Sequence, residues 1–505
     1  MKLLYITIEY KPMVGGGASF TKDLCKYLAK QKNLELLLVT SGEQDNIEYE
    51  DGYTIHRYKT LHDFWHSKLD LNLALENIAN SIETFKPDII HSIHQNATLL
   101  TEIVNQNYKI PLIITHHRTP QFNRGKTVKN GKELLFDFTN IFNENHFIAP
   151  TKTYIKALFE SIKRLDEKQI SLVYPGVDEE FYNKSNTTPE TINNIKNKLE
   201  IKADDKVILL PMRLRNRKGL GFLANSLSTY TKHQLKIILT GYPEDASEEK
   251  IREDFEAKIK NIHTLVPKYQ YSNEDMLNLY QICNCMILPS EGEGYGCVLL
   301  EALSIGCPII ATNVSGINEV IKPDLNGQLI EYGNTDQLKD AIYKYITDDN
   351  FRNQTIINGY KVQKEMFDPN IWAKNHINIY KQIITDTEIK INSLAYIVSN
   401  NKIEIILNEK QQFILEKKLN PGYQLSVQAA KILEENYKIN IEKRADFTLN
   451  NREYVFAFEL NEQPINSTSI SLEKLLANKS LSSLEKKALK NLLTSHNATY
   501  ICKNQ

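Results

Sequence analysis

Residues 284–301 decide the fold of this chain, and they read Asn-Cys-Met-Ile-Leu-Pro-Ser-Glu-Gly-Glu-Gly-Tyr-Gly-Cys-Val-Leu-Leu-Glu. The apolar run at the start predicts a strand, and residues 296–305 predict a helix that ends before Gly306-Cys-Pro308. A glycine-rich turn from a strand into a helix exposes backbone N–H groups at the helix N-terminus, where phosphate binds. Glu293 lies in the turn, and Glu301 lies about one turn into the helix. The stretch therefore predicts an anion site beside two acceptors for hydroxyl groups, which suits a nucleotide-sugar.

The same alternation of short apolar runs and amphipathic helical segments extends from residue 3 to residue 388, with a restart in the middle. It predicts an α/β protein with two Rossmann-like, doubly wound parallel-sheet domains that face a cleft. We expect helices at Ala18–Lys30 and Leu73–Phe85, among others. We expect strands at Leu3–Ile8, Leu34–Thr40, Asp88–His91, Leu112–Thr115 and Phe147–Ala149, and then at Val207–Pro211, Leu235–Thr240, Ile262–Leu265, Cys285–Leu288 and Ile309–Ala311.

The division into domains follows from this pattern. We expect a first domain at residues 1–172 and a second at 173–388, joined by a hinge near Val173–Phe181, where Pro175 and Gly176 interrupt regular structure. The segment 367–388 predicts a last long helix.

Residues 390–505 differ, because they contain a single glycine, Gly422. We expect a small α+β accessory domain there that contacts a partner, a second copy or the acceptor. Its order of elements faintly resembles a Nudix domain without most of the metal-binding glutamates. The expected strands are Leu394–Val398, Ile403–Leu407, Gln412–Leu415 and Tyr454–Phe458, and the expected helices are Val427–Tyr437 and Leu472–Leu493.

The composition is that of an ordinary globular protein, with 41% apolar and 24% charged residues among 505. A net charge of -1 gives no support for nucleic-acid binding. No apolar run is long enough to span a membrane, and the start of the chain shows no signal peptide. We expect Cys283 and Cys285 to share one strand as core thiols of a reducing cytoplasm. The predicted location is cytoplasmic, with peripheral contact at the inner membrane face left open.

Residues 289–308 closely resemble the signature of glycosyltransferase family 4, within the two-domain GT-B class. The resemblance implies that Glu293 contacts the donor sugar near the reacting centre and that Glu301 binds the ribose. It also places Gly294, Tyr295 and Gly296 against the nucleotide-sugar. The second domain then holds the donor, the first holds most of the acceptor, and the last helix, with Trp372 as a packing anchor, returns to the first domain.

Two further segments resemble loops of that family. Residues 8–19 contain Gly15, Gly16 and Gly17, and the resemblance implies that this loop approaches the diphosphate and the reacting sugar. Residues 211–219 contain Arg213 and Lys218, which match the family pattern of an arginine and a lysine that stabilise the charge of the leaving diphosphate. We expect Arg215 and Arg217 to be solvated.

Histidines gather at the ends of two predicted strands. The resemblance assigns His117 a place near the donor sugar, where it bonds a hydroxyl or helps a proton move. We expect His94 and His116 to be packed or indirect. The chain lacks any Asp-x-Asp, so we expect no metal and no cofactor besides the nucleotide-sugar co-substrate. The family element at residues 314–319 implies that Gly316 admits the donor phosphates, whereas Glu319 is as much a structural candidate as a functional one.

These features predict a glycosyltransferase that moves a hexose or N-acetylhexosamine from a UDP-sugar, or a GDP-sugar, to an acceptor hydroxyl. The family resemblance implies that this transfer is retaining. The base would be held by backbone around Leu265–Lys268. Glycan, lipid-linked and protein acceptors stay open, in glycan or cell-surface polysaccharide biosynthesis. Two alternatives stay open as well: a sugar-nucleotide 2-epimerase of the same fold, and a non-catalytic scaffold.

Overall fold

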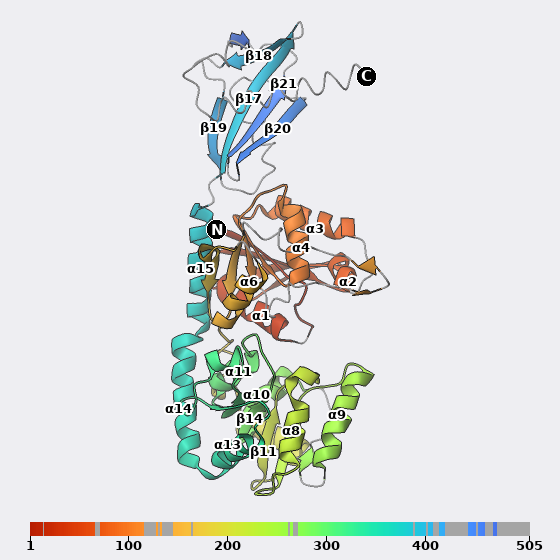
Figure 1. The fold of residues 1–505 in the computed structure, drawn as a ribbon, viewed down its shortest axis with the longest axis vertical. Helices are drawn as coiled ribbons and strands as arrows, with labels where there is room; N and C mark the ends of the chain where they lie inside the picture. Colours follow the sequence, from red (N-terminus) through yellow and green to blue (C-terminus); the bar gives the residue numbers. More distant parts are fainter. Residues whose placement is uncertain are drawn as a thin grey trace.

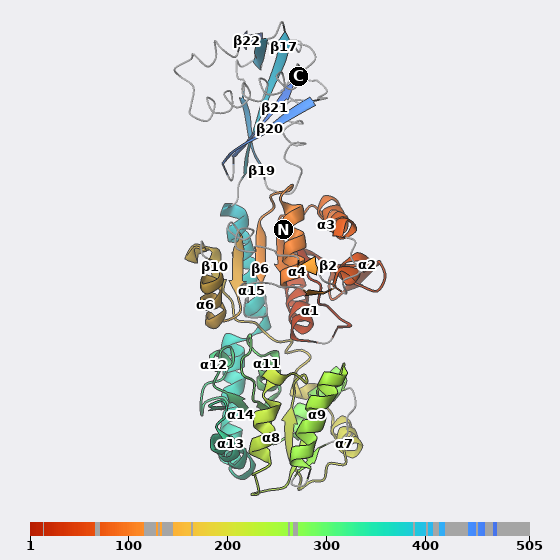
Figure 2. The same cartoon turned by 45° about the vertical axis from the view of Figure 1, so that its right-hand side comes forward.

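The computed structural model describes residues 1–13, 15–65, 71–115, 128–129, 132–133, 145–162, 165–260, 263–265 and 271–386, and six strands between 389 and 471. Two α/β domains and a third sheet follow one another along the long axis of the molecule, as Figures 1 and 2 show. None of the helices in these ranges has the length and apolar character that a membrane span needs.

The first domain is built on an eight-stranded sheet in the order β10-β9-β6-β5-β1-β2-β4-β3. Its pairs are parallel, except that β3 runs antiparallel to β4. The strands are β1 (Lys2–Ile6), β2 (Glu35–Ser41), β3 (Asn46–Glu50), β4 (Tyr53–Tyr58), β5 (Ile89–Ile93), β6 (Leu112–Thr115), β9 (His146–Ala149) and β10 (Ile170–Leu172), and the helices are α1 (Gly16–Ala29), α2 (Lys59–Trp65), α3 (Leu71–Phe85), α4 (Gln95–Asn105), α6 (Lys152–Ser161) and the 3₁₀ turn Glu167–Gln169.

The five strands expected in this domain are confirmed, but the hairpin β3–β4 was not predicted. It turns at Asp51 and Gly52, both with positive φ (49° and 91°). Two central residues with positive φ are typical of the type I′ turn, whose twist matches the twist of the two strands that it joins. The sheet therefore has an antiparallel edge. A separate two-stranded ribbon joins β7 (Val128–Lys129) to β8 (Lys132–Glu133).

The second domain contains a parallel six-stranded sheet in the order β13-β12-β11-β14-β15-β16. Its central strands are buried on both faces, as helices on the two sides of a parallel sheet require. The strands are β11 (Lys206–Leu210), β12 (Leu235–Leu239), β13 (Thr264–Leu265), β14 (Cys285–Leu288), β15 (Ile309–Thr312) and β16 (Gln328–Ile330), and the helical segments are Lys184–Asn186 (3₁₀), α7 (Pro189–Lys198), η3 (Asn216–Lys218, 3₁₀), α8 (Leu220–Leu227), α9 (Ala246–Ile259), α10 (Asn273–Ile282), α11 (Cys297–Ile305), α12 (Ile317–Val320), α13 (Thr335–Thr347) and α14 (Asp349–Met366).

The prediction that Cys283 and Cys285 share a strand is wrong. Helix α10 continues to Ile282, and Cys283 is its C-cap residue, so Cys283 lies before the strand rather than in it. Cys285 is the first residue of β14. The Cys283 thiol lies 3.3 Å from the Cys307 sulfur instead. Cys25, Cys283, Cys285, Cys297 and Cys307 are free thiols.

The last helix, α15 (Pro369–Asp386), packs on α1 of the first domain, which confirms the expected return. Trp372 is 1% exposed, and its ring lies edge-on to Phe20, with centroids 4.8 Å apart. Further along, the Tyr380 hydroxyl and His91 Nδ1 are 2.7 Å apart. Trp372 is therefore the packing anchor that the sequence predicted.

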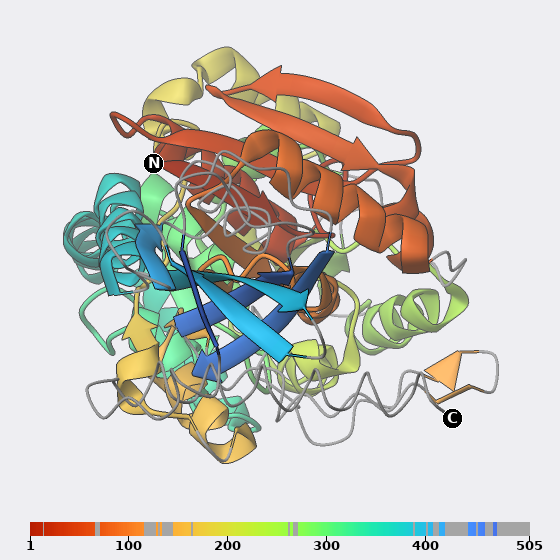
Figure 3. The same cartoon turned by 90° about the horizontal axis from the view of Figure 1, so that it is seen from above.

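A third, mixed sheet follows α15 in the order β20-β21-β17-β18-β22, with β19 pairing β17. Figure 3, a view along the long axis, shows its strands crossing in front of the first domain. The four strands expected here are found, and the helices expected at 427–437 and 472–493 lie outside the described residues. The strands are β17 (Ile389–Ser399), β18 (Lys402–Leu407), β19 (Ile414–Leu419), β20 (Lys443–Asn450), β21 (Glu453–Glu459) and β22 (Thr468–Ser471).

Candidate active site between the two parallel sheets

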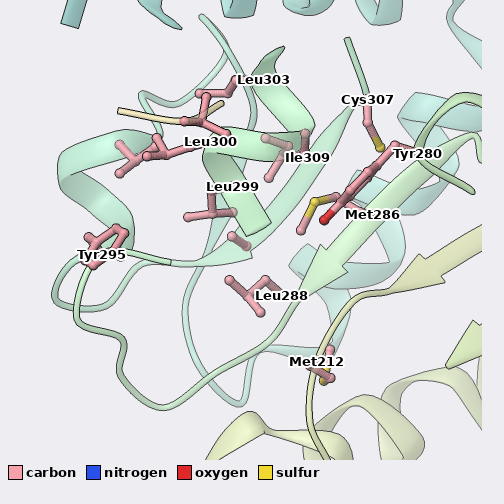
Figure 4. Close-up of a cluster of buried hydrophobic side chains, with 14 of the residues drawn as sticks. Met212, Tyr280, Met286, Leu288, Tyr295, Leu299, Leu300, Leu303, Cys307 and Ile309 are labelled. Atoms are coloured by element: carbon pink, nitrogen blue, oxygen red, sulfur yellow. The ribbon is translucent and has the colours of Figure 1, made fainter. Parts of the chain in front are cut away.

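Helix α11 is fixed by the apolar cluster of Figure 4, in which Leu299, Leu300 and Leu303 pack with side chains of β14 and β15. Gly296 caps the helix with φ 70°, a left-handed conformation that favours glycine. The turn from β14 therefore ends at a rigid helix N-terminus, as the sequence predicted. Its backbone N–H groups and the positive end of the helix dipole favour an anion there.

Glu293, in that turn, is paired with Lys218. The Lys218 ammonium donates a hydrogen bond to Glu293 Oε1, and the Ser290 hydroxyl donates to the same oxygen at 2.6 Å. The two charged side chains are only 14% and 10% exposed. The sequence placed these residues on different parts of the donor, whereas the structure pairs them with each other.

Gly219 explains why Lys218 reaches this turn. Its φ is 74°, and a Cβ added there would lie 1.8 Å from the Pro289 carbonyl oxygen. The loop after β11 and the loop after β14 are therefore in backbone contact, and the Glu291 N–H also donates to the Arg217 carbonyl at 2.9 Å. This approach brings a cation from one loop to a carboxylate on the other.

Glu301 lies deeper than the sequence suggested, with 9% of its surface exposed. The Tyr280 hydroxyl donates to its Oε2 at 2.7 Å. Burial raises the pKa of Glu301, and the nearby hydroxyl groups of Tyr280 and Tyr182 oppose that rise. Its predicted contact with ribose stays a prediction.

The glycine loop of the first domain meets the second domain at this point. A Cβ added to Gly15 would lie 3.8 Å from the exposed guanidinium of Arg213, and one added to Gly16 would lie 3.2 Å from the Cys297 sulfur. The Cys297 thiol in turn donates to the Gly16 carbonyl at 3.6 Å. The structure thus brings Gly15, Gly16 and Arg213 next to the start of α11.

Gly17 lies against Glu9 and His94, two residues that the sequence did not assign to the site. A Cβ on Gly17 would lie 2.4 Å from Glu9 Oε2 and 2.7 Å from His94 Nε2. Glu9 had no predicted role, and His94 was expected to be packed or indirect. An acidic residue three positions after the end of β1 and a histidine directly after β5 share the carboxyl edge of one sheet, and this shared edge was the signal in the sequence. His116 and His117 lie outside the described residues.

The other residues of the predicted site contact neighbouring parts of the protein. Tyr295 is 5% exposed, and its ring lies 5.9 Å from that of Phe20 in the first domain. Gly316 contacts the backbone of the β14 turn, since a Cβ there would lie 2.4 Å from the Glu293 carbonyl oxygen. Gly294 contributes its carbonyl to the same contact. Arg215, expected to be solvated, forms an ion pair with the buried Glu248 at 2.7 Å.

Glu319 joins the two domains. Its carboxylate accepts hydrogen bonds from the backbone N–H groups of Lys152 (2.7 Å) and Thr153 (2.9 Å), at the N-terminus of α6 in the first domain. The Tyr174 hydroxyl donates to it as well, at 3.1 Å. A carboxylate at a helix N-terminus satisfies unpaired N–H groups and complements the helix dipole. These contacts give Glu319 a structural part.

Within the described ranges, no group of three or more histidine, cysteine, aspartate or glutamate side chains could hold a metal ion. The expectation of a metal-independent site stays a prediction.

Two family models match this chain. Residues 14–181 match "Glycosyltransferase Family 4", and residues 191–362 match "Glycosyl transferases group 1". An uncharacterised glycosyltransferase of Methanocaldococcus jannaschii is 24% identical over 75% of this chain and 98% of its own length. The N-acetyl-alpha-D-glucosaminyl L-malate synthase of Bacillus anthracis is 25% identical over 76% of this chain and 98% of its own length.

Solved structures share the fold. Sucrose-phosphate synthase from Thermosynechococcus elongatus superimposes with a TM-score of 0.64 at 17% identity, over 76% of this chain and 99% of that one. HepE of Anabaena, solved in complex with UDP-glucose, gives a TM-score of 0.59 at 17% identity, over 76% of this chain and 100% of its own.

Two parallel sheets whose carboxyl edges meet at a glycine loop, two cations and a helix N-terminus define a glycosyltransferase of the GT-B fold. The two family matches together cover more than half of the chain, and the chain belongs to the family 4 type of these enzymes.

Proposed function

We propose that this glycosyltransferase transfers a hexose or N-acetylhexosamine from a UDP-sugar, with a GDP-sugar as the second choice, to an acceptor hydroxyl with retention of the anomeric configuration. The observation that carries the proposal is the meeting of Arg213, Lys218 and the start of α11 with Gly15 and Gly16. Cations and helix N–H groups in one place fit a diphosphate. The complex of HepE with UDP-glucose supports a nucleotide-sugar donor.

The donor has a defined effect on the Lys218–Glu293 pair in this proposal. The β-phosphate offers Lys218 a stronger negative partner than one carboxylate, so Lys218 turns to the phosphate. Glu293 Oε1 is then free to accept hydrogen bonds from hydroxyl groups of the sugar. Within the pair the two largely buried charges neutralise each other, and the donor diphosphate takes the place of Glu293 as the partner of Lys218.

The chemical step breaks the bond between the anomeric carbon and the diphosphate oxygen and forms a bond to the acceptor oxygen on the same face. The acceptor proton passes to the departing diphosphate, which leaves as a nucleoside diphosphate. Arg213 and Lys218 stabilise the charge that develops there. Glu293 Oε1 keeps its hydrogen bond from the Ser290 hydroxyl when Lys218 turns to the phosphate, an arrangement that favours a hydroxyl-binding role over attack on the sugar.

We place the reaction in the cytoplasm, since free thiols such as Cys283 and Cys307 fit a reducing compartment. In this proposal the domain at residues 1–172 binds most of the acceptor, and the domain at residues 173–388 binds the donor. Residues 390–505 would contact the acceptor, a partner or a second copy.

The test is a screen of the full chain against UDP- and GDP-sugars, by thermal shift and by release of the nucleoside diphosphate. We expect a UDP-sugar to raise the melting temperature and to be slowly hydrolysed. The anomeric configuration of the product, read by NMR, then tests retention. Incubation with the donor alone tests the epimerase alternative, because an epimer formed without acceptor would contradict transfer.

A further inference from the structure

We propose that Glu9 and His94 form the part of the acceptor site that receives the reacting end of the acceptor, and that they select an uncharged sugar or polyol over an anionic acceptor. The proposal rests on the transferase function above and names the acceptor class that the same site takes.

Glu9 and His94 face each other across two neighbouring strands. Glu9 follows β1 and His94 follows β5, and these strands are adjacent in the first sheet. His94 Nε2 lies 3.4 Å from Glu9 Oε2, and His94 Nδ1 lies 3.1 Å from the Thr7 hydroxyl. Both ring nitrogens therefore have a neighbour, which fixes the orientation of the imidazole.

The pair lies beside the donor contacts. Gly17 abuts Glu9 and His94, and a Cβ added to Gly15 would lie 3.8 Å from the Arg213 guanidinium. The Cα atoms of Gly15 and Gly17 are at most about 7.6 Å apart, since they are separated by two peptide units. One short glycine segment thus joins the cation proposed for the diphosphate to the Glu9–His94 pair. This separation fits a sugar that leaves the diphosphate on one side and reaches an acceptor hydroxyl on the other.

The chemistry of the pair favours hydroxyl groups. The side chains of Glu9 and His94 are 19% and 13% exposed, enough for a ligand to touch them. A carboxylate accepts hydrogen bonds from hydroxyls and repels a carboxylate or phosphate on the acceptor. Lys11, two residues after Glu9, does not cancel this repulsion of anions, because its ammonium forms an ion pair with Glu50. An imidazole held by Glu9 and Thr7 also bonds hydroxyl groups.

His94 adopts a backbone conformation that side chains rarely take, with φ 72° and ψ 148° at the residue before α4. Such conformations are strained and persist where the surrounding structure holds them, and they cluster at functional sites. A glycine would take it at less cost, so the histidine at this position is consistent with a use for its ring.

The experiment compares two matched series of acceptor analogues: neutral p-nitrophenyl glycosides and the corresponding p-nitrophenyl uronides, which differ by one carboxylate. Binding of each to the full chain in the presence of UDP is measured by saturation-transfer NMR, and transfer is measured where it occurs. We expect the wild-type protein to prefer the neutral series by about tenfold or more. Glu9→Gln should reduce that preference by about tenfold, because the amide removes the repulsion.

Glu35→Gln is the control, because it makes the same change at the amino end of β2, on the opposite edge of the sheet, and should leave the preference unchanged. His94→Asn should weaken binding of the neutral series and leave UDP binding intact. Thermal melting of each variant shows whether it is folded. The wild-type comparison needs no variant and tests the proposal even if both variants fail to fold.

Equal binding of the two series, preference for the uronides, or no binding of either series to protein that binds UDP would overturn the acceptor assignment alone. A wild-type protein that binds no nucleoside diphosphate would instead remove the proposed function on which it rests.

Discussion

The Lys218 ammonium and the Glu293 carboxylate form an ion pair between two loops of the second sheet, and both side chains are at least 86% shielded from solvent. Two loops far apart in sequence thus deliver opposite charges to the turn before α11. If a donor diphosphate replaces Glu293 as the partner of Lys218, the two residues must respond differently to substitution.

We predict that Lys218→Ala weakens binding of UDP itself, whereas Glu293→Gln, which removes the charge that competes for Lys218, tightens UDP binding and lowers turnover. Loss of one contact to the developing charge costs about 2.7–4 kcal/mol in the barrier, or 10²–10³ in rate. Isothermal titration with UDP and measurement of kcat on both variants test this. Weak UDP binding by Glu293→Gln would contradict the exchange of partners.

Gly219 offers a test of the contact between the two loops. We predict that Gly219→Ala destabilises the protein and abolishes donor binding, because its Cβ would collide with the Pro289 carbonyl and its φ is 74°. Gly221→Ala is the control two residues on, in α8, where a Cβ would meet nothing within 4 Å. This control should be neutral or stabilising, by up to about 1 kcal/mol. Urea denaturation of both variants decides the matter, and equal stabilities would contradict the loop contact.

Glu319 should hold the two domains together. Replacing it with alanine removes the acceptor for the N–H groups of Lys152 and Thr153, and loss of such a cap typically costs about 0.5–2 kcal/mol. We expect Glu319→Ala to lower the melting temperature and to raise the radius of gyration in small-angle scattering. An unchanged radius would show that α15 alone sets the arrangement of the domains.

Asp23 gives a pH test. Burial and the neighbouring Asp178 raise the pKa of Asp23 to about 7. The folded state therefore retains a proton that the unfolded chain releases at lower pH. The contribution of Asp23 is fully present below the unfolded pKa and declines as the pH rises to 7. We predict that Asp23→Asn, which still accepts from the Asp178 N–H, is more stable than the wild type at pH 8 and similar to it at pH 4. Thermal melts at the two pH values measure this, and a constant difference would contradict it.

The sequence predicted the parallel sheets well, because buried parallel strands appear as short apolar runs between helices. It missed β3 and β4, although Asp51-Gly52 is a hairpin signal, because Glu48 and Glu50 alternate with Ile47 and Tyr49 and leave no continuous apolar run. The edge strands β10 and β16 are only three residues long and left no clear run.

Of the candidate site, the sequence identified the residues with recognisable spacing, such as Arg213 and Glu293. It could not show that Lys218 binds Glu293, because this pairing depends on the approach of Gly219 to Pro289 in space. Glu9 was missed for the same reason. The role proposed for Glu9 follows from its contacts with Gly17, which lies in the next element, and with His94, which is distant along the chain.

The affinity of the full chain for UDP, compared with that of Arg213→Ala, tests the central claim most directly. The Arg213 guanidinium lies beside Gly15, where an added Cβ would be 3.8 Å from it, and this guanidinium is proposed to hold the diphosphate. We predict measurable binding by the wild-type protein and a loss of about tenfold or more in the variant. No binding of UDP or GDP by the wild-type protein, or equal binding by the variant, would contradict the account.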